Sequence, residues 1–128
     1  MKFKAYLKEL DKIYDVDLID FKNELVTLNK PYGNKEYLFK EVVILPFTGL
    51  EGKDKEDIFE GHILEDRDGN KSCIKFSEED ARFYLHMIKD GTVLNKVTHI
   101  NQPEAWFHKI IGHVELGGKK WAERLKCS

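Results

Sequence analysis

The sequence from Pro46 to Phe76 reads P-F-T-G-L-E-G-K-D-K-E-D-I-F-E-G-H-I-L-E-D-R-D-G-N-K-S-C-I-K-F and holds the densest turn chemistry of the chain. Asp68-Gly69, near its end, is a strong hairpin signal, because a type I′ turn needs positive φ at both central residues. A turn centred there places Asp66 opposite Lys71, two opposite charges that stabilise the pairing of the strands. We therefore predict a hairpin at this point of the chain.

The alternation of side chains in this hairpin places Ile63, Ile74 and Phe76 on one face, which we expect to be the core side. Gly61 lies just before the first strand of the hairpin and after an apolar pair. A glycine at such a place indicates a bulge or a close approach of two backbones. The same register would place His62 across from Lys75.

The wider pattern T-G-L-x-x-x-x-x-x-x-I-F-E-G-H-I-L, at residues 48–64, resembles the YopX family of small proteins encoded by phages and prophages. The usual form in that family is similar to T-G-L-K-D-K-N-G-K-E-I-Y-E-G-D-I-V, which aligns without a gap. The opening K-F-K-A-Y at 2–6 looks like K-F-R-A-W, and I-I-G-H-V at 110–114 looks like V-I-G-N-I. We interpret the following residues as a structural motif: Thr48, Gly49, Leu50, Gly61, Asp68 and Gly69.

The resemblance implies a mainly β fold with a small barrel-like antiparallel sheet, a tendency to form homo-oligomers, and no established biochemical activity. Two positions depart from the family pattern. His62 replaces the aspartate of the family, and the turn glycine of the family is replaced near Lys55, with Gly52 earlier in the loop. Residues 77–107 have no counterpart in the resemblance.

Composition bounds the class of protein. A chain of 128 residues with 41% hydrophobic content fits one domain, residues 1–128, that buries about two-thirds of its unfolded surface. Charged residues make up 34% with a net charge of −2, whereas general nucleic-acid binders carry a basic excess. Two cysteines, Cys73 and Cys127, fit reduced thiols in a cytoplasm. We find neither a membrane span nor a secretory signal, so we expect a cytoplasmic protein.

Elsewhere the patterns indicate short strands joined by turns. We expect one or two short helices beside them. A helix at 77–91 is favoured over a strand, because Ser77 and Asp80 resemble a capping box and Gly91 a helix end, although the same residues also alternate as in a strand. Pro46 should end a strand ladder. The predicted strands are 3–7, 13–21, 25–28, 37–45, 92–100 and 108–116, with a loop at 29–35, a helical turn near 103–107 and a terminal helix at 119–126.

Two groups of residues are candidates for a metal site. The histidines lack a standard ligand spacing such as H-x-x-x-H, although convergence of His99 and His113 with Cys73 stays open. The acidic group lacks the further oxygen ligands of a calcium loop and fits a solvated strand face. We predict no metal, no cofactor and no catalytic residue. The histidines of the first group are His86, His99, His108 and His113, and the acidic group is Asp15, Asp17 and Asp20.

An aromatic and basic cluster near the end of the chain is a candidate interface, since aromatic side chains anchor interfaces and stack on bases. The alternative is a segment that packs its tryptophans on the sheet and leaves its lysines in water. The candidate interface residues are Trp106, Phe107, Lys109, Lys119, Lys120, Trp121 and Arg124.

We therefore predict a non-enzymatic binding protein of a phage or prophage, most simply a homo-oligomeric interaction module. Two alternatives remain open. A nucleic-acid-binding β-barrel would bind DNA or RNA in a salt-sensitive way, and an anti-defence inhibitor would bind a host protein.

Overall fold

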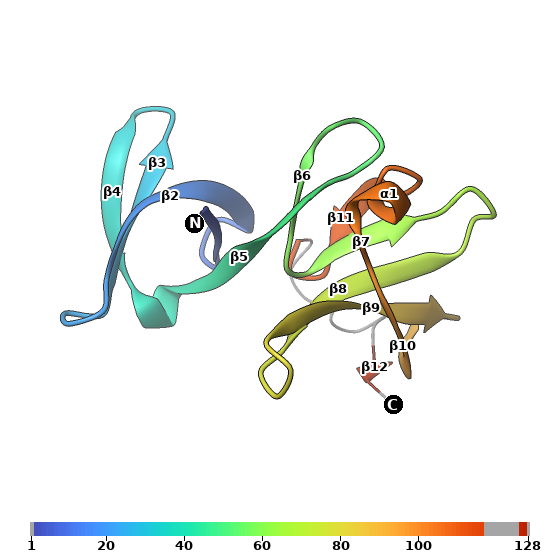
Figure 1. Cartoon of the computed structure of the whole chain (residues 1–128). Helices are drawn as coiled ribbons and strands as arrows, with labels where there is room; N and C mark the ends of the chain where they lie inside the picture. Colours follow the sequence, from blue (N-terminus) through green and yellow to red (C-terminus); the bar gives the residue numbers. More distant parts are fainter. Residues whose placement is uncertain (1, 117–125, 128) are drawn as a thin grey trace. The chain divides into compact units, whose positions relative to one another are not determined.

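The structure, a computed structural model, describes residues 2–116 and 126–127. The chain divides into two compact units, Met1–Pro46 and Phe47–Ser128, and each has its own apolar core. Almost all of the described secondary structure is β-strand, with one four-residue α-helix and one 3₁₀ turn (Figure 1). The predicted mainly β class with one or two short helices is confirmed.

The first unit is a four-stranded meander with a fifth strand returning beside the first, in the order β4-β3-β2-β1-β5. All these pairings are antiparallel. Its core is built from side chains of four of the strands, among them Leu7, Leu28 and Tyr37. Its elements are β1 (Phe3–Leu7), β2 (Lys12–Asp20), β3 (Leu25–Lys30), β4 (Gly33–Leu38), the 3₁₀ turn η1 (Phe39–Glu41) and the first half of β5 (Val42–Glu51).

The second unit contains the rest of β5, its partner β6, and a sheet in the order β11-β7-β8-β9-β10-β12. Neighbouring strands are antiparallel except β10 and β12, which are parallel. Neither strand order returns to its first strand among the described residues, so both sheets are open. The elements are β6 (Asp57–Phe59), β7 (His62–Glu65), β8 (Lys71–Ser77), β9 (Arg82–Lys89), β10 (Thr92–His99), α1 (Gln102–Ala105), β11 (Lys109–His113) and β12 (Lys126–Cys127).

Two predictions in the first half need correction, and a third holds for one of two pairings. Residues 29–35 form no open loop, because β3 and β4 pair up to Lys30 and Gly33 around a two-residue turn. The predicted strand at 37–45 is interrupted by η1. Pro46 ends the pairing of β5 with β1, as predicted for a residue without an N–H. The strand itself continues, and from Phe47 onward it pairs with β6.

The predicted hairpin exists, but its register differs by one residue. Ile63 pairs with Cys73 and Glu65 with Lys71, so Ile63 and Ile74 lie on opposite faces and in different core clusters. Both faces of β7 and β8 are therefore buried. Phe76 remains 40% exposed, and the slip also moves Lys75 away from the position opposite His62.

The cause of the slip is the turn. Gly69 has φ +83°, but Asp68 is not left-handed, so the turn is not type I′. The N–H of Gly69 donates to the carbonyl of Asp66 at 3.2 Å, and the N–H of Asp66 donates to the carbonyl of Asn70 at 3.0 Å. This is a three-residue loop with its glycine in the left-handed position. The carboxylate of Asp66 accepts the N–H groups of Asp68 and Asn70, both at 2.9 Å, and holds the loop.

The prediction of a helix at 77–91 is wrong, since Arg82–Lys89 is strand β9. Asp90 and Gly91 have φ of 52° and 76°, and Lys89 pairs with Thr92. This is the type I′ hairpin that an Asp-Gly pair favours, so Gly91 ends no helix. The helical turn near 103–107 is present as α1. Of the predicted helix at 119–126, residues 119–125 lie outside the described residues, and Lys126 belongs to β12.

Candidate functional site

The T-G-L part of the motif forms an irregularity in β5, inside the second unit. The pairing of β5 with β6 passes from Phe47 opposite Phe59 to Glu51 opposite Asp57, so three residues face only Ile58. The Thr48 hydroxyl closes this bulge: it donates to the carbonyl of Ile58 at 2.7 Å and accepts the N–H of Leu50 at 3.1 Å. The threonine hydroxyl therefore serves the backbone.

Gly49 and Leu50 complete the bulge. Gly49 has φ +86°, a conformation that glycine adopts without strain. The turn it makes directs Leu50 against the core cluster that contains Ile58 and Leu64. The T-G-L pattern thus forms a bulge in β5 that places Leu50 against the core.

Gly61, also part of the motif, lies against the segment that contains His113 and Val114. Its φ is +88°, and a Cβ at this position would overlap the imidazole ring of His113. Its N–H donates to the carbonyl of Ile74 at 2.8 Å, and its carbonyl accepts the N–H of Val114 at 2.9 Å. The close approach indicated by the sequence is present, and it joins the central motif to the late segment at 110–114.

His113, 1% exposed, uses both ring nitrogens. Its Nε2 donates to the carbonyl of Glu60 at 2.7 Å, and its Nδ1 accepts the N–H of Glu115 at 3.0 Å. Because Nδ1 accepts a hydrogen bond, the ring is the neutral Nε2–H tautomer. Burial lowers the pKa of His113 below its ordinary value of 6.5, which agrees with that assignment.

His62 lies beside His113, with ring centroids 5.3 Å apart and the two residues paired across β7 and β11. Its Nδ1 accepts the N–H of Phe59 at 2.9 Å. Both histidines therefore form hydrogen bonds with the backbone where residues 48–64 meet residues 110–114. They do not form a metal centre: among residues 2–116 and 126–127, no group of three or more histidine, cysteine or acidic side chains is arranged to hold a metal ion.

The other histidines lie apart. His108 is hydrogen-bonded through Nδ1 to the carbonyl of Glu104 at 2.8 Å. His86 is half-buried on β9, and burial lowers its pKa. His99 contacts the ring of Tyr84, with centroids 5.0 Å apart. The acidic group in the first unit has structural roles as well, since Asp15 forms an ion pair with Lys4 at 3.6 Å.

Asp20, in the same group, accepts the side-chain amide of Asn23 at 2.8 Å and the N–H of Asn23 at 3.1 Å. The hydrogen bond from the Asn23 side chain lowers the pKa of Asp20. Asp17, the third member, falls between the paired residues Val16 and Leu18 at a register shift in β2. The three carboxylates are thus engaged or exposed separately.

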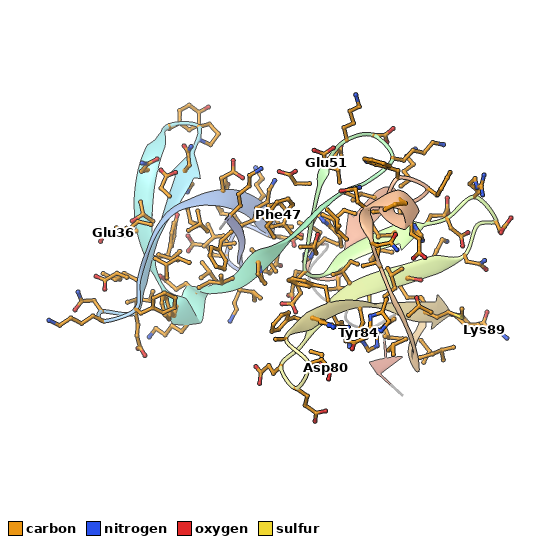
Figure 2. All side chains as sticks on the ribbon, in the orientation of Figure 1. Glu36, Phe47, Glu51, Asp80, Tyr84 and Lys89 are labelled. Carbon is orange, nitrogen blue, oxygen red and sulfur yellow. The ribbon has the colours of Figure 1, made fainter. Side chains whose placement is uncertain are left out.

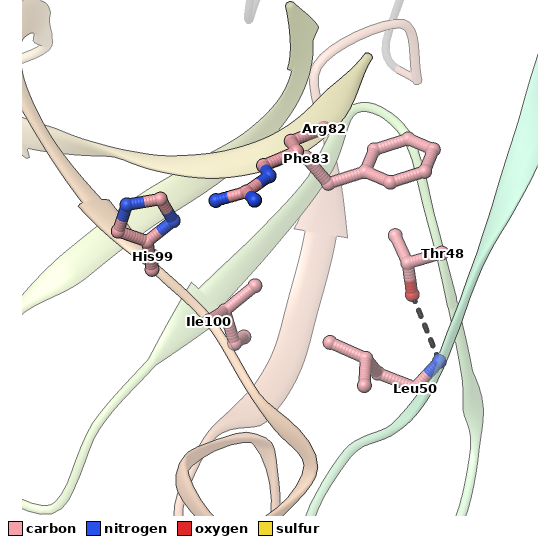
Figure 3. Close-up of a pocket in the computed structure, with 6 residues that line it drawn as sticks. All are labelled: Thr48, Leu50, Arg82, Phe83, His99 and Ile100. Carbon is pink, nitrogen blue, oxygen red and sulfur yellow. Dashed lines mark hydrogen bonds between the residues drawn. The ribbon is translucent and has the colours of Figure 1, made fainter. Parts of the chain in front are cut away.

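A pocket of about 300 Å³ opens in the second unit (Figure 3). The guanidinium of Arg82 points toward the ring of His99, while the T-G-L segment forms the opposite wall. The lining residues are Thr48, Leu50, Arg82, Phe83, His99 and Ile100. The pattern favoured at 77–91 places Arg82 on a helix, whereas Arg82 begins strand β9, so the sequence does not predict this pocket. The rival strand pattern at 77–91 is the signal that could have placed Arg82 and Tyr84 on one face of a strand beside β10.

The aromatic candidate interface is present in part. Trp106 and Phe107 follow α1 and are 53% and 52% exposed. The guanidinium carbon of Arg67 lies 4.5 Å from the centroid of the Phe107 ring, a cation–π contact, and Lys109 is exposed at the start of β11. We call Arg67, Trp106, Phe107 and Lys109 the aromatic surface. The other predicted interface residues, Lys119, Lys120, Trp121 and Arg124, lie outside the described residues.

Helix α1 holds this surface in place through polar side chains. The carbonyl oxygen of the Asn101 side chain accepts the N–H of Glu104 at 3.0 Å, which caps the helix. Gln102 forms two hydrogen bonds with the backbone of Glu51, one in each direction, at 3.0 and 2.9 Å. The exposed aromatic pair therefore sits on a fixed turn.

Within the part of the chain that the structure describes, no helix combines the length and the apolar character that a membrane crossing requires.

The fold and the motif contacts define a mainly β protein with two open sheets, in which the shared sequence pattern is structural. The profile described as YopX protein matches residues 2–114, so this chain belongs to the YopX family. It is also similar to the crystal structure of protein EF1440 from Enterococcus faecalis, at 19% identity and a TM-score of 0.58, over 88% of this chain and 92% of that one. This likeness concerns the fold alone. A comparison with curated proteins finds no match.

Proposed function

We propose that the protein is a non-enzymatic, homo-oligomeric binding module, encoded by a phage or prophage and acting in the host cytoplasm. The YopX family is one of uncharacterised function, and its phage and prophage setting, which the sequence resemblance implies, supports the origin proposed for this chain. The observation that carries the binding role is the pair of half-exposed aromatic side chains, Trp106 and Phe107, on a turn that polar contacts hold in place.

Side chains of this kind are typical of binding hot spots. Tryptophan and arginine are enriched among the residues that dominate interface energies, and here Arg67 already lies against the ring of Phe107. Neighbouring aromatic side chains that stay exposed to water often mark a surface that binds a partner, because binding removes their apolar area from water.

A second copy of the chain suits this surface, for two reasons. Asp66, Asp68 and Glu104 line a hollow together with Arg67 and Phe107, so both signs of charge are present, and a mixed patch can be complementary to itself about a two-fold axis. In addition, β11 has a strand neighbour on one side only among the described residues, and such an edge can pair with another strand.

The absence of catalysis is supported by the use of the polar groups in the motif. The Thr48 hydroxyl and both ring nitrogens of His113 are bound to backbone groups. A hydroxyl or imidazole whose polar atoms are bound to backbone groups is a poor nucleophile or base. To act as one, its oxygen or nitrogen must face the reacting atom of a substrate.

Light scattering on the full chain tests the proposal. We expect a mass of at least twice the 15.0 kDa of one chain, and we expect a Trp106→Ala/Phe107→Ala double variant to shift toward monomer. Phe21→Ala is the matched control, because Phe21 is an aromatic side chain exposed to 74% on the other unit. A Trp121→Ala variant and a chain ending at Leu116 examine the predicted interface residues beyond the described ones.

A wild-type monomer at micromolar concentration would contradict self-association. The aromatic surface would then be examined for a host protein or a nucleic acid, by pull-down from a host lysate with a nuclease-treated control. Binding to DNA or RNA would show itself by its strong dependence on salt.

A further inference from the structure

We propose that the pocket lined by Thr48, Leu50, Arg82, Phe83, His99 and Ile100 binds a carboxylate that is attached to a small apolar group. We call it the Arg82 pocket. It shares no residue with the aromatic surface and does not depend on the proposed self-association. The inference follows from which of its polar groups are already engaged and which are not.

The Thr48 side chain in the wall formed by β5 offers no hydrogen-bond donor to a ligand. The Thr48 hydroxyl donates its hydrogen to Ile58 and accepts the N–H of Leu50, and Figure 3 shows this second bond within the pocket wall. Thr48 therefore has no hydroxyl hydrogen left for a carboxylate, and Leu50 beside it is apolar. The donors that remain for a ligand belong to Arg82 and His99.

Arg82 is exposed and forms no ion pair among the described residues. A guanidinium offers paired N–H donors whose geometry matches a carboxylate. The ring of His99 lies opposite Tyr84 in the β9–β10 pairing and contacts it at 5.0 Å between centroids. This contact orients the imidazole next to the guanidinium, so both donor groups face the same space (Figure 3).

The lining of the pocket includes no acidic side chain, and Asp80, in the turn before β9, is engaged elsewhere. The Tyr84 hydroxyl donates to Oδ2 of Asp80 at 2.6 Å (Figure 2). This hydrogen bond raises the pKa of Tyr84, so the phenol remains protonated and Asp80 keeps its partner. Arg82, which forms no ion pair among the described residues, is thus left for an external anion.

The apolar side chains of the pocket determine the size and character of the uncharged part of the ligand. Leu50, Phe83 and Ile100 all pack against the core cluster of the second unit, so they form fixed walls. A volume of about 300 Å³ has room for roughly ten water-sized groups of about 30 Å³ each. Such a ligand is a free short-chain or phenyl-substituted carboxylic acid, or the terminal carboxylate of a peptide that ends in an apolar residue.

The test is a titration of the full chain, followed by the NMR signals of residues around Arg82. The probes are 3-phenylpropanoate and an acetylated tripeptide that ends in phenylalanine with a free carboxylate. Their amides are the controls. We expect at least one acid to bind and its amide to bind at least tenfold more weakly. Preference for the free acid or for the peptide identifies the source of the carboxylate.

Arg82→Gln should weaken binding about 10- to 100-fold, since a hydrogen bond to a charged group contributes about 1.5–3 kcal/mol and 1.4 kcal/mol is tenfold. His99→Gln gives a second, independent test of the donor pair. Lys22→Gln removes an exposed cation in the first unit, outside both the pocket and the aromatic surface; it is the matched control and should leave binding unchanged. Binding of neither acid, equal binding of acid and amide, equal binding of inorganic phosphate, or an unchanged affinity in Arg82→Gln would overturn the proposal.

Discussion

Three glycines of the second unit separate two reasons for requiring glycine. Gly49, Gly61 and Gly69 have nearly the same φ, +86°, +88° and +83°. An added Cβ would meet nothing within 4 Å at Gly49 or Gly69, but at Gly61 it would overlap the His113 ring. Left-handed backbone costs a residue with a Cβ about 1–2 kcal/mol, and overpacking in a core adds about 1–3 kcal/mol.

We therefore expect Gly61→Ala to lower the free energy of unfolding by about 2–5 kcal/mol. Gly49→Ala and Gly69→Ala should each cost only about 1–2 kcal/mol. Urea denaturation followed by circular dichroism measures the three values under the same conditions. Equal losses at all three positions would mean that the contact of Gly61 with His113 contributes nothing beyond the backbone conformation.

His113 makes stability depend on pH. Its folded-state pKa lies below the ordinary value of 6.5 because the ring is buried. Below about pH 6.5 the unfolded chain takes up a proton that the folded chain refuses, so stability is fully present above that pH and falls as the pH decreases. We expect the free energy of unfolding to be constant between pH 8 and 7 and to decrease from pH 6.5 to 5.

Two variants assign this pH dependence. His113→Asn introduces the residue that stands here in the V-I-G-N-I form of the family, and it should flatten the decrease. His86→Gln should remove a further part, because burial also lowers the pKa of His86. A His113→Asn chain with the same pH profile as the wild type would show that His113 does not carry the effect.

At the scale of the elements, two Asp-Gly pairs show what sequence can and cannot predict. Asp90-Gly91 forms the type I′ turn that such a pair favours. Asp68-Gly69 does not, because the carboxylate of Asp66 binds two N–H groups of the loop and stabilises a longer turn. Local propensity predicted a hairpin at the right place, but the competing side-chain bond shifted the register by one residue.

The role of the Asp66 carboxylate in holding the loop can be tested by mutation. Asp66→Ala should lower stability by about 1 kcal/mol, as for the loss of a capping side chain. Asp68→Ala is the matched control, because Asp68 takes part through its backbone N–H. Although burial acts in the opposite direction, the N–H groups of Asn70 and Asp68 lower the pKa of Asp66. Its contribution is therefore present above about pH 4 and lost as the pH falls further.

Thermal denaturation of the two alanine variants at pH 7 and pH 3 measures this contribution. The difference between Asp66→Ala and the wild type should shrink at pH 3, while Asp68→Ala should follow the wild type at both. If Asp66→Ala were as stable as Asp68→Ala at pH 7, the hydrogen bonds of Asp66 would not hold the loop.

The candidate sites were harder to predict than the strands. Trp106 and Phe107 were recognisable because they lie close to Lys109 in a sequence segment that combines aromatic and basic residues, a composition typical of interfaces. The Arg82 pocket was not, since it joins β5, β9 and β10, and no local pattern brings Thr48 near His99. Residues 77–91 fit both the helical and the strand period, and only pairing with β8 and β10 decides between them.

At the scale of the whole molecule, the buried apolar side chains are divided between the two units. One core cluster is built only from the first unit, with Leu7, Val26 and Leu28 among its buried side chains. Two others, with Ile58, Leu64 and Ile74 in one and Ile63 and Cys73 in the other, are built only from the second. The YopX profile nevertheless runs through both units, from residue 2 to residue 114. Whether the chain behaves as the predicted single domain therefore depends on whether the two units unfold together.

Leu28→Ala and Leu64→Ala address it, because both leucines are fully buried, one in each unit. A buried leucine truncated to alanine costs about 2–5 kcal/mol. With separate cores, we expect Leu28→Ala to speed hydrogen exchange of amides in β3 and to leave β8 protected, and Leu64→Ala to do the reverse. Val97→Ala, at a surface position with 43% exposure, is the control that should change neither. Loss of protection in both units from either leucine variant would show instead that the chain unfolds as one cooperative domain.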